Sequence, residues 1–337
     1  MPKAVIMAGG QGERFWPMTH AKFPKYRIPF YGKKSLLQKT CERLEKVYGK
    51  GGVYVITTAQ HAGFIREELP KLPRKNILIE PSRRNTAAAI YLSTALLGKE
   101  FGDDEIISFY PADHLIENEK LFQSTVRGAI ALAKTHDYLV TVGIKPTFPA
   151  TGYGYIESGK PIRGSKDAFL VKRFVEKPDL SKAQKYLRNP RFFWNGGIFT
   201  WKVSVFMESM KRFSPEIVKS LDLSRVKQSY PKVPNISIDY ALFEKADNIA
   251  ICRTTMDWCD VGNWDMYYSK NPRDKAGNYI HGLSAHLESS GCLLVNHSDT
   301  PLITLGVSDL VVVQTPRGTL VCRRGRAEEA ALLFKKI

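Results

Sequence analysis

Short runs of β-branched and other apolar residues alternate with longer amphipathic stretches through the first half of the chain. The apolar runs favour buried parallel strands, and they lie at 4–7, 53–57, 76–80, 105–110 and 138–144. The stretches between them have the apolar spacing of helices, at 35–48, 60–69, 86–99 and 119–135. Repeated strand–helix units predict an α/β fold with a doubly wound, mixed but mainly parallel sheet, of the Rossmann-like kind.

Two of the predicted helices carry start signals. Ser35 with Gln38 forms a capping box, and Asn85 is expected as the N-cap of the helix that follows it. Ligands of doubly wound sheets bind at the carboxyl ends of the strands. The residues that follow Met7, Glu80 and Tyr110 are therefore candidates for a binding site.

The pattern changes after about residue 150. Glycine-rich turns and antiparallel-looking strands at 153–158, 168–177 and 196–201 predict an extension of the same sheet. From Pro272 onward helical periodicity is lost and short apolar pieces recur, ending in a helical stretch over 327–337. We expect a first domain over 1–268 and a small all-β domain with a terminal helix over 272–337, whose short strands suit a left-handed β-helix.

Composition narrows the class of protein without choosing a function. Of 337 residues, 43% are hydrophobic and 25% are charged, which excludes a disordered chain or a disulfide scaffold. The net charge of +17 suits nucleic acid, an anionic membrane face or small phosphorylated substrates equally well. Five cysteines without a C-x-x-C pair predict reduced thiols. With no signal peptide and no apolar run long enough to span a membrane, we expect a cytoplasmic protein that does not enter the membrane.

The loop after the first strand has the chemistry of a phosphate cradle. It reads AGGQGER over 8–14, and its glycines at 9, 10 and 12 allow the backbone to approach a ligand with free amides. The spacing is neither G-x-G-x-x-G nor a Walker A loop, and a tight turn alone would also explain it. Arg14 and Lys25 add two cations suited to a polyphosphate, although a surface lysine is the simpler interpretation of Lys25 taken alone.

The longer string MAGGQGERFWPMTHAKFPKY, over 7–26, resembles the signature of the sugar-1-phosphate nucleotidyltransferases. Its Trp-Pro pair resembles the mannose-1-phosphate guanylyltransferase branch of that family. Further matches follow in order along nearly the whole chain: EPSRRNTAAAI from 80, PADH from 111, FVEKP from 174, WNGGIF from 194 and WCDVGNW from 258. The third alanine of the first of these, where many relatives carry proline, is a small departure.

The resemblance implies transfer of GMP from GTP to mannose 1-phosphate, which yields GDP-mannose and pyrophosphate with the help of Mg²⁺. The implied catalytic residues are Lys25 and Arg14, and the implied metal ligands are Asp113 and Asp260. Sugar-phosphate binding is implied for Gly152, Glu176, Lys177 and Asn195. GTP binding is implied for Ala8, Gly9, Gly10, Gln11, Gly12, Glu13, Arg14, Glu80, Pro81, Asn85, Thr86 and Asp113.

The residues themselves support some of these roles and leave others open. Two carboxylates at a triphosphate suit Mg²⁺. Taken alone, an aspartate at a strand end is better explained by helix capping or turn formation, and Asp257 competes with Asp260. A carboxylate such as Glu80 can accept from the guanine N1–H and amino groups, or it can pair with Arg83 or Arg84. For Trp194 a place in the core is favoured over contact with a sugar.

Two other functions compete with this one. A relative that uses another base or hexose would keep the loop, Lys25 and both aspartates, and a non-catalytic regulatory subunit could be built on the same fold. The charged residues of the motifs are all present, which argues against the second. No nucleic-acid motif is visible. We further expect transferase activity without isomerase activity. The exposed edges of the short strands over 272–337 need covering, by the terminal helix or by a partner chain, so we expect a homodimer.

Overall fold

The computed structural model describes residues 1–10, 12–30, 32–329 and 332. The chain falls into two units. The first, here called the sheet unit, comprises Met1–Gly9, Lys39–Ala112 and Ile116–Trp258. The second, called the loop–tail unit, comprises Gly10–Gln38, Asp113–Leu115 and Cys259–Ile337. The domain boundary expected between 268 and 272 stays a prediction.

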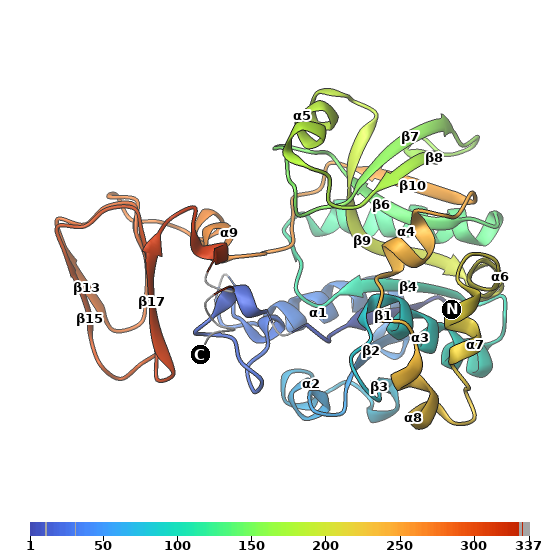
Figure 1. Cartoon of the computed structure of the whole chain (residues 1–337), viewed down its shortest axis with the longest axis horizontal. Coiled ribbons are helices and arrows are strands. Elements are labelled where there is room, and N and C mark those ends of the chain that lie inside the picture. The colour runs from blue at the N-terminus through green and yellow to red at the C-terminus, as the bar shows by residue number, and fades with distance from the viewer. Residues whose placement is uncertain (11, 31, 330–331, 333–337) are drawn as a thin grey trace. The chain divides into compact units, whose positions relative to one another are not determined.

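Nine strands form the mixed sheet of the sheet unit, in the order β3-β2-β1-β4-β9-β6-β10-β8-β7 (Figure 1). Strands β1 to β4 run parallel, β9 runs antiparallel between β4 and β6, and β10 is parallel to β6. The predicted doubly wound, mixed sheet is confirmed, together with its extension after residue 150. The strands are β1 (Lys3–Met7), β2 (Val53–Thr58), β3 (Ile77–Glu80), β4 (Ile106–Pro111), β6 (Leu139–Ile144), β7 (Tyr155–Pro161), β8 (Ala168–Val175), β9 (Phe192–Lys202) and β10 (Ile249–Thr254).

Helices cover both faces of this sheet because neighbouring residues of a strand point to opposite sides. On β4, the Phe109 ring lies 5.2 Å from that of Trp201, in the core that α3 and α6 complete. The ring of the next residue, Tyr110, packs against the ring of Phe122 of α4, with 6.0 Å between the ring centroids. Its hydroxyl shares a hydrogen bond with the Tyr48 hydroxyl of α1. The helices are α1 (Leu36–Tyr48), α2 (Ala62–Glu68), α3 (Asn85–Phe101), α4 (Glu119–Thr135), α5 (Leu180–Arg188), α6 (Val203–Phe213), α7 (Pro215–Ser220) and α8 (Val226–Ser229).

Of the two predicted helix starts, one is confirmed and one is wrong. The capping box is confirmed, because the Ser35 N–H donates to Gln38 Oε1 at 3.0 Å and the Gln38 N–H donates to Ser35 Oγ at 3.2 Å. The prediction that Asn85 is an N-cap is wrong. Asn85 is the first residue of α3, with a φ of 62°, and its Oδ1 accepts from the adjacent Thr86 N–H. An N-cap side chain instead reaches two or three residues ahead from extended backbone.

The β tail of the loop–tail unit stacks short parallel strands. Strand β14 (Leu293–Asn296) lies between β12 (Tyr279–His281) and β16 (Leu310–Thr315), all parallel, and β13 (Ser284–Leu287) is parallel to β15 (Leu302–Leu305). Such stacking is typical of the coils of a β-helix. Strand β17 (Gly318–Arg323) closes the stack as an antiparallel partner of β16. The predicted terminal helix over 327–337 lies largely outside the described residues, which give a 3₁₀ turn at Ala327–Glu329.

An aromatic core joins the loop to helix α9 (Trp264–Lys270) within the loop–tail unit. The Phe15 ring lies 4.9 Å from that of Trp264, and the Phe30 ring lies 4.8 Å from that of Tyr267. Trp264 also donates its indole N–H to the carbonyl of Trp16 at 3.1 Å. These contacts fix the segment between residues 12 and 30, on which the predicted catalytic cations lie.

All five cysteines are free thiols, as predicted. Among the described helices, none combines the length and the apolar character that crossing a membrane requires.

Candidate functional site

The three glycines of the loop after β1 have different surroundings. A Cβ on Gly9 would lie 3.3 Å from Oε1 of Glu80, whereas a Cβ on Gly10 would meet nothing within 4 Å. Gly12 has a φ of 71°, and a Cβ there would lie 2.5 Å from the Cβ of Lys25. The glycine at position 12 is therefore required by backbone conformation and by close approach together.

The residues that flank these glycines differ in burial and in their hydrogen bonds. Ala8 is buried, with its N–H donating to the Ile56 carbonyl and its own carbonyl accepting from the Thr57 hydroxyl. Gln11 lies outside the described residues. Glu13 and Arg14 are exposed on the 3₁₀ turn η1 (Glu13–Phe15). Within the part of the chain that the structure describes, no salt bridge involves Arg14, which leaves its guanidinium N–H groups for an anion.

Lys25 joins the two aspartates that the sequence predicted as metal ligands. Its ammonium lies 2.8 Å from Oδ2 of Asp113 and donates to the backbone carbonyl of Asp260 at 2.6 Å. The Lys25 side chain is only 13% exposed, so solvent screens this ion pair weakly. All three residues belong to the loop–tail unit, although 235 positions separate Lys25 from Asp260.

This arrangement keeps Asp113 ionised. Burial alone would raise the pKa of its carboxyl, but the Lys25 ammonium and then His114 outweigh burial and lower that pKa. An ionised carboxylate is the form that binds a hard cation. Among the described residues no group of three or more His, Cys, Asp and Glu side chains is placed to hold a metal ion. A cation at Asp113 and Asp260 would thus need oxygen atoms from a ligand or water as well.

In the sheet unit, Glu80 lies at the end of β3 and is 6% exposed. Its Oε2 accepts from the Tyr230 hydroxyl at 2.7 Å, and no ion pair of Glu80 with Arg83 or Arg84 occurs among the described residues. Burial raises the pKa of Glu80, while the Tyr230 hydrogen bond and Arg83 oppose that rise. One oxygen, Oε1, faces Gly9.

The residues after Glu80 are partly committed to the fold. Pro81 is partly exposed and Asn85 is exposed at the start of α3. The Thr86 hydroxyl accepts from the Ile238 N–H at 2.9 Å, which ties the start of α3 to the segment before the π-helix η6 (Asp239–Phe243). The hydroxyl proton of Thr86 can still be donated to a ligand.

A second polar cluster of the sheet unit gathers around Glu176. The Lys177 ammonium lies 3.4 Å from Oε1 of Glu176, and a Cβ on Gly154 would lie 2.5 Å from Oε2 of Glu176. Asn195 donates to Asp239 Oδ1 at 2.9 Å, and its own Oδ1 accepts from the Thr141 hydroxyl. The structure thus brings together Glu176 and Lys177 of the FVEKP motif with Asn195 of the WNGGIF motif.

The two carboxyl groups of this cluster resist ionisation. Burial, followed by the charge of Asp239, raises the pKa of Glu176 to about 7, against the lowering effect of Lys177. Burial also raises the pKa of Asp239. A carboxyl that is protonated near neutral pH can both donate and accept hydrogen bonds, which suits the hydroxyls of a sugar.

Gly152 and Trp194 lie in contrasting surroundings. Gly152 is exposed, and a Cβ there would meet nothing within 4 Å. Trp194 is 3% exposed and packs edge-to-face on Phe148 and Tyr153, so its predicted place in the core is confirmed.

Sequence reasoning missed two residues of these clusters. Tyr230 holds Glu80 from 150 positions away, and no local pattern marks it. Asp239 orients Asn195 from the short string SIDYALF, in which an aspartate between apolar residues was a signal that could have been noticed.

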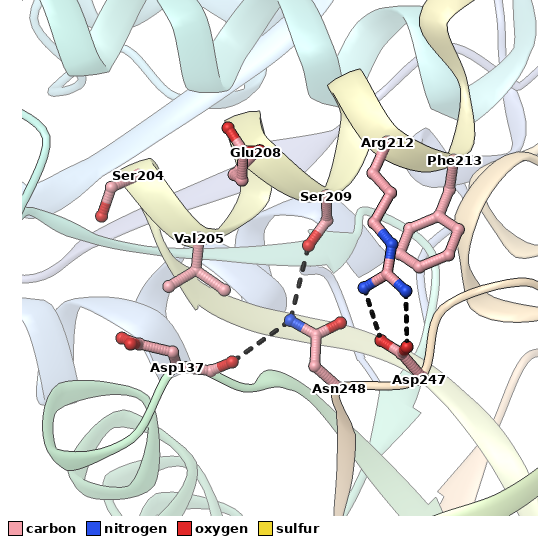
Figure 2. Close-up of a pocket in the computed structure, with 9 residues that line it drawn as sticks. All are labelled: Asp137, Ser204, Val205, Glu208, Ser209, Arg212, Phe213, Asp247 and Asn248. Carbon is pink, nitrogen blue, oxygen red and sulfur yellow. Dashed lines mark hydrogen bonds and ion pairs between the residues drawn. The ribbon is translucent and has the colours of Figure 1, made fainter.

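A separate hollow of about 340 Å³ lies where β6 and β10 begin, at the opposite ends of these strands from their carboxyl ends (Figure 2). Figure 2 shows Arg212 pairing with Asp247 and Asn248 donating to Ser209 and to the backbone of Asp137. None of the predicted site residues lines this hollow. It is therefore distinct from both clusters described above.

Comparison with known proteins gives a consistent picture. The nucleotidyl transferase family model matches residues 3–277, and the model of the MannoseP isomerase/GMP-like beta-helix domain matches residues 283–336. The chain is 34% identical to a mannose-1-phosphate guanylyltransferase of Klebsiella pneumoniae, over 96% of this chain and 71% of that protein. It is 35% identical to one of Salmonella typhimurium, over 99% of this chain and 72% of that protein.

A solved structure covers the same extent. The crystal structure of a protein described as mannose-1-phosphate geranyltransferase, from Thermus thermophilus, superposes with a TM-score of 0.87 at 31% identity. The match covers 99% of this chain and 98% of that one. The α/β domain followed by a β-helix-like domain, predicted from the sequence, is thereby confirmed.

Proposed function

The chain belongs to the nucleotidyl transferase family, among the mannose-1-phosphate guanylyltransferases, and from this premise we propose that it transfers GMP from GTP to mannose 1-phosphate. An oxygen of the sugar phosphate attacks the α-phosphorus in line, the bond to the β-phosphate oxygen breaks, and pyrophosphate leaves as GDP-mannose forms. The attacking phosphate is already an anion, so no residue has to remove its proton. Positioning the two anions and offsetting their charge then supplies the catalysis.

The contacts of Lys25 carry this proposal. A lysine ammonium has three N–H donors, and Asp113 and the Asp260 carbonyl each engage the ammonium of Lys25. These two contacts hold the ammonium in place and leave a third donor for an oxygen of the α-phosphate. Arg14 and the amides of Gly10 and Gly12 would bind the departing pyrophosphate.

The donor set at Asp113 and Asp260 fits Mg²⁺. Both are carboxylates, Asp113 has a lowered pKa, and Mg²⁺ commonly takes one or two protein carboxylates with phosphate and water oxygens as its remaining ligands. When bound, the ion would withdraw negative charge from the phosphate oxygens. Asp113 and Asp260 would hold the ion, and Lys25, which contacts both residues, would keep them close together.

The two clusters of the sheet unit would supply selectivity. We propose that Glu80 accepts from the guanine N1–H and amino groups, with Tyr230 fixing its orientation, and that Pro81, Asn85 and Thr86 complete the nucleotide contacts. Glu176, Asn195 and the backbone of Gly152 would bind mannose hydroxyls, and Lys177 would bind the incoming phosphate. Lys177 is 59% exposed, which suits a group that meets a charged ligand.

The test is a nucleotide panel assayed by pyrophosphate release with mannose 1-phosphate and Mg²⁺. We expect GTP to be used far better than ATP, CTP or UTP, and mannose 1-phosphate better than glucose 1-phosphate. Equal turnover of GTP and UTP would contradict the assigned base. No release with any triphosphate would favour the regulatory-subunit alternative.

We also propose that the chain forms a homodimer through the β tail. Leu287, Ile303 and Leu305 on β13 and β15 are 64%, 72% and 65% exposed, which leaves apolar side chains for a partner to cover. Light scattering of the full chain should give twice the monomer mass, and replacing Ile303 and Leu305 with Ser should give the monomer. A dimer that survives these changes would exclude this face.

A further inference from the structure

The loop–tail unit contains a cavity that none of the roles above uses. Its volume is about 380 Å³, within the range of about 300–1,000 Å³ typical of small-molecule sites. One wall comes from the segment between Pro17 and Phe23 and the other from the β tail. The lining residues are Pro17, Met18, His20, Phe23, His297, Thr315, Pro316 and Arg317.

The charge of the lining favours an anion. His20, His297 and Arg317 are basic, and no acidic residue lines the cavity. The exposed Arg317 makes no salt bridge within the described ranges of the chain. Burial, then Arg317 and Lys22, lowers the pKa of His20, as expected for an imidazole in positive surroundings.

The His20 ring offers a defined donor. Its Nδ1 accepts from the Lys22 N–H at 3.2 Å, so the neutral ring carries its proton on Nε2. An imidazole N–H and a guanidinium in one cavity can donate to two or more oxygens of a phosphate.

The rest of the lining is apolar and partly aromatic. Met18 is 6% exposed, and Pro17 and Pro316 add rigid apolar surface. The Phe23 ring is partly exposed and lies 6.3 Å from the His20 ring. An aromatic ring beside proline surface forms an apolar wall on which a flat ring can stack.

The cavity wall is linked directly to the predicted catalytic loop. The Thr19 hydroxyl donates to the Gly12 carbonyl at 2.6 Å. The Thr315 hydroxyl lies 3.3 Å from the Gly318 carbonyl and 3.5 Å from the Pro17 carbonyl. Residues 17–23 also join Gly12 to Lys25 along the chain. A ligand in the cavity would therefore touch the segment that holds both of them.

We propose that this cavity is a second ligand site, which takes a planar aromatic ring bearing a phosphate, the class to which a purine mononucleotide belongs. The phosphate is bound by Arg317, His20 and His297, and the ring packs on Phe23 and the two prolines. This site goes beyond the proposed function, because it shares no residue with the groups assigned to catalysis, base or sugar.

The test uses GMP as probe and the histidine ring signals of the full chain as readout. In protein labelled at its seven histidines, His297→Gln identifies the His297 signal, which lies in the β tail and away from the assigned catalytic residues in the sequence. We expect this signal to shift and saturate with GMP, whereas guanosine and inorganic phosphate shift it at concentrations at least about tenfold higher.

Arg317→Glu should weaken the GMP-induced shift about tenfold or more, while the exposed Arg323→Glu on the same hairpin serves as matched control and should not. Both variants should retain pyrophosphate release. The inference is overturned if His297 does not respond to millimolar GMP, if phosphate alone produces the same shift, or if Arg317→Glu binds as the wild type does. Because release is measured separately, failure of the proposed function would be seen without affecting this outcome.

Discussion

Replacement of Gly12 by alanine tests the link between loop conformation and the position of Lys25. An alanine at a φ of 71° adopts left-handed backbone at a cost of about 1–2 kcal/mol. Its Cβ would also lie 2.5 Å from the Lys25 Cβ, so one of the two segments has to move. Relief of such overpacking costs about 1–3 kcal/mol more.

The displacement matters for activity as well as for stability. The Lys25 ammonium is held by Asp113 and the Asp260 carbonyl, and a shift of its stem moves it away from both. A misplacement of about 1 Å can lower a rate about a hundredfold. We therefore expect Gly12→Ala to lose about 2–5 kcal/mol in free energy of unfolding and to release pyrophosphate about a hundredfold more slowly.

Two other glycines provide matched controls. A Cβ on Gly10 meets nothing within 4 Å and its φ is not in the left-handed region, so Gly10→Ala should remain near wild type in both measurements. Gly164 has a φ of 81° with open space around it, so Gly164→Ala should lose stability without losing turnover. Denaturant unfolding and steady-state pyrophosphate release at saturating substrates give the two quantities. Equal losses for Gly10→Ala and Gly12→Ala, or wild-type turnover of Gly12→Ala, would refute the reasoning.

Three further changes test the two clusters and the lysine. Lys25→Ala should slow pyrophosphate release about a hundredfold to a thousandfold while calorimetric GTP affinity falls much less, and a matched loss in both would make Lys25 a binding residue only. Tyr230→Phe removes the hydroxyl that donates to Glu80, and it should cost about 1.5–3 kcal/mol in free energy of unfolding. The same change should raise the KM for GTP more than it lowers kcat. An unchanged KM would remove Tyr230 from base recognition. Glu176 has a folded-state pKa of about 7 against the ordinary 4.5, so the folded chain binds more protons and its stability should fall as pH rises from about 4.5 to 7. Unfolding at pH 5 and 7.5 should show that Glu176→Gln flattens this fall, and an unchanged slope would contradict the assignment.

The sheet and its helices could be predicted because their signals are local. Buried parallel strands need continuous apolar runs, and the capping box at Ser35 lies within four residues. The partner of Glu80 could not be found in this way, since Tyr230 comes from a distant segment. The orientation of Asn195 by Asp239 likewise depends on how η6 packs against β9. Periodicity also gave no sign that Asn85 would leave the extended conformation of an N-cap.

Backbone strain is the feature of the candidate site that is hardest to predict from the sequence. Asn85, Lys177 and Val261 are three of the five described non-glycine residues with positive φ, and all three fall in the motif segments. Left-handed backbone is least tolerated by a β-branched residue, and Val261 has a φ of 44°. Strain of this kind costs on the order of 1–3 kcal/mol per residue and persists only where the surroundings enforce it.

The surroundings of Val261 meet that requirement. Its side chain is fully buried, and its N–H donates to the Cys259 sulfur at 3.3 Å. The strained residue directly follows Asp260, whose carbonyl accepts from Lys25, and directly precedes Gly262, where a Cβ would lie 3.3 Å from the Asp260 carboxylate. Relaxing Val261 to ordinary backbone would turn that carbonyl away from the ammonium. The buried core around α9 thus maintains the strain, and the strain in turn sets the position of Lys25, the cation proposed to meet the α-phosphate.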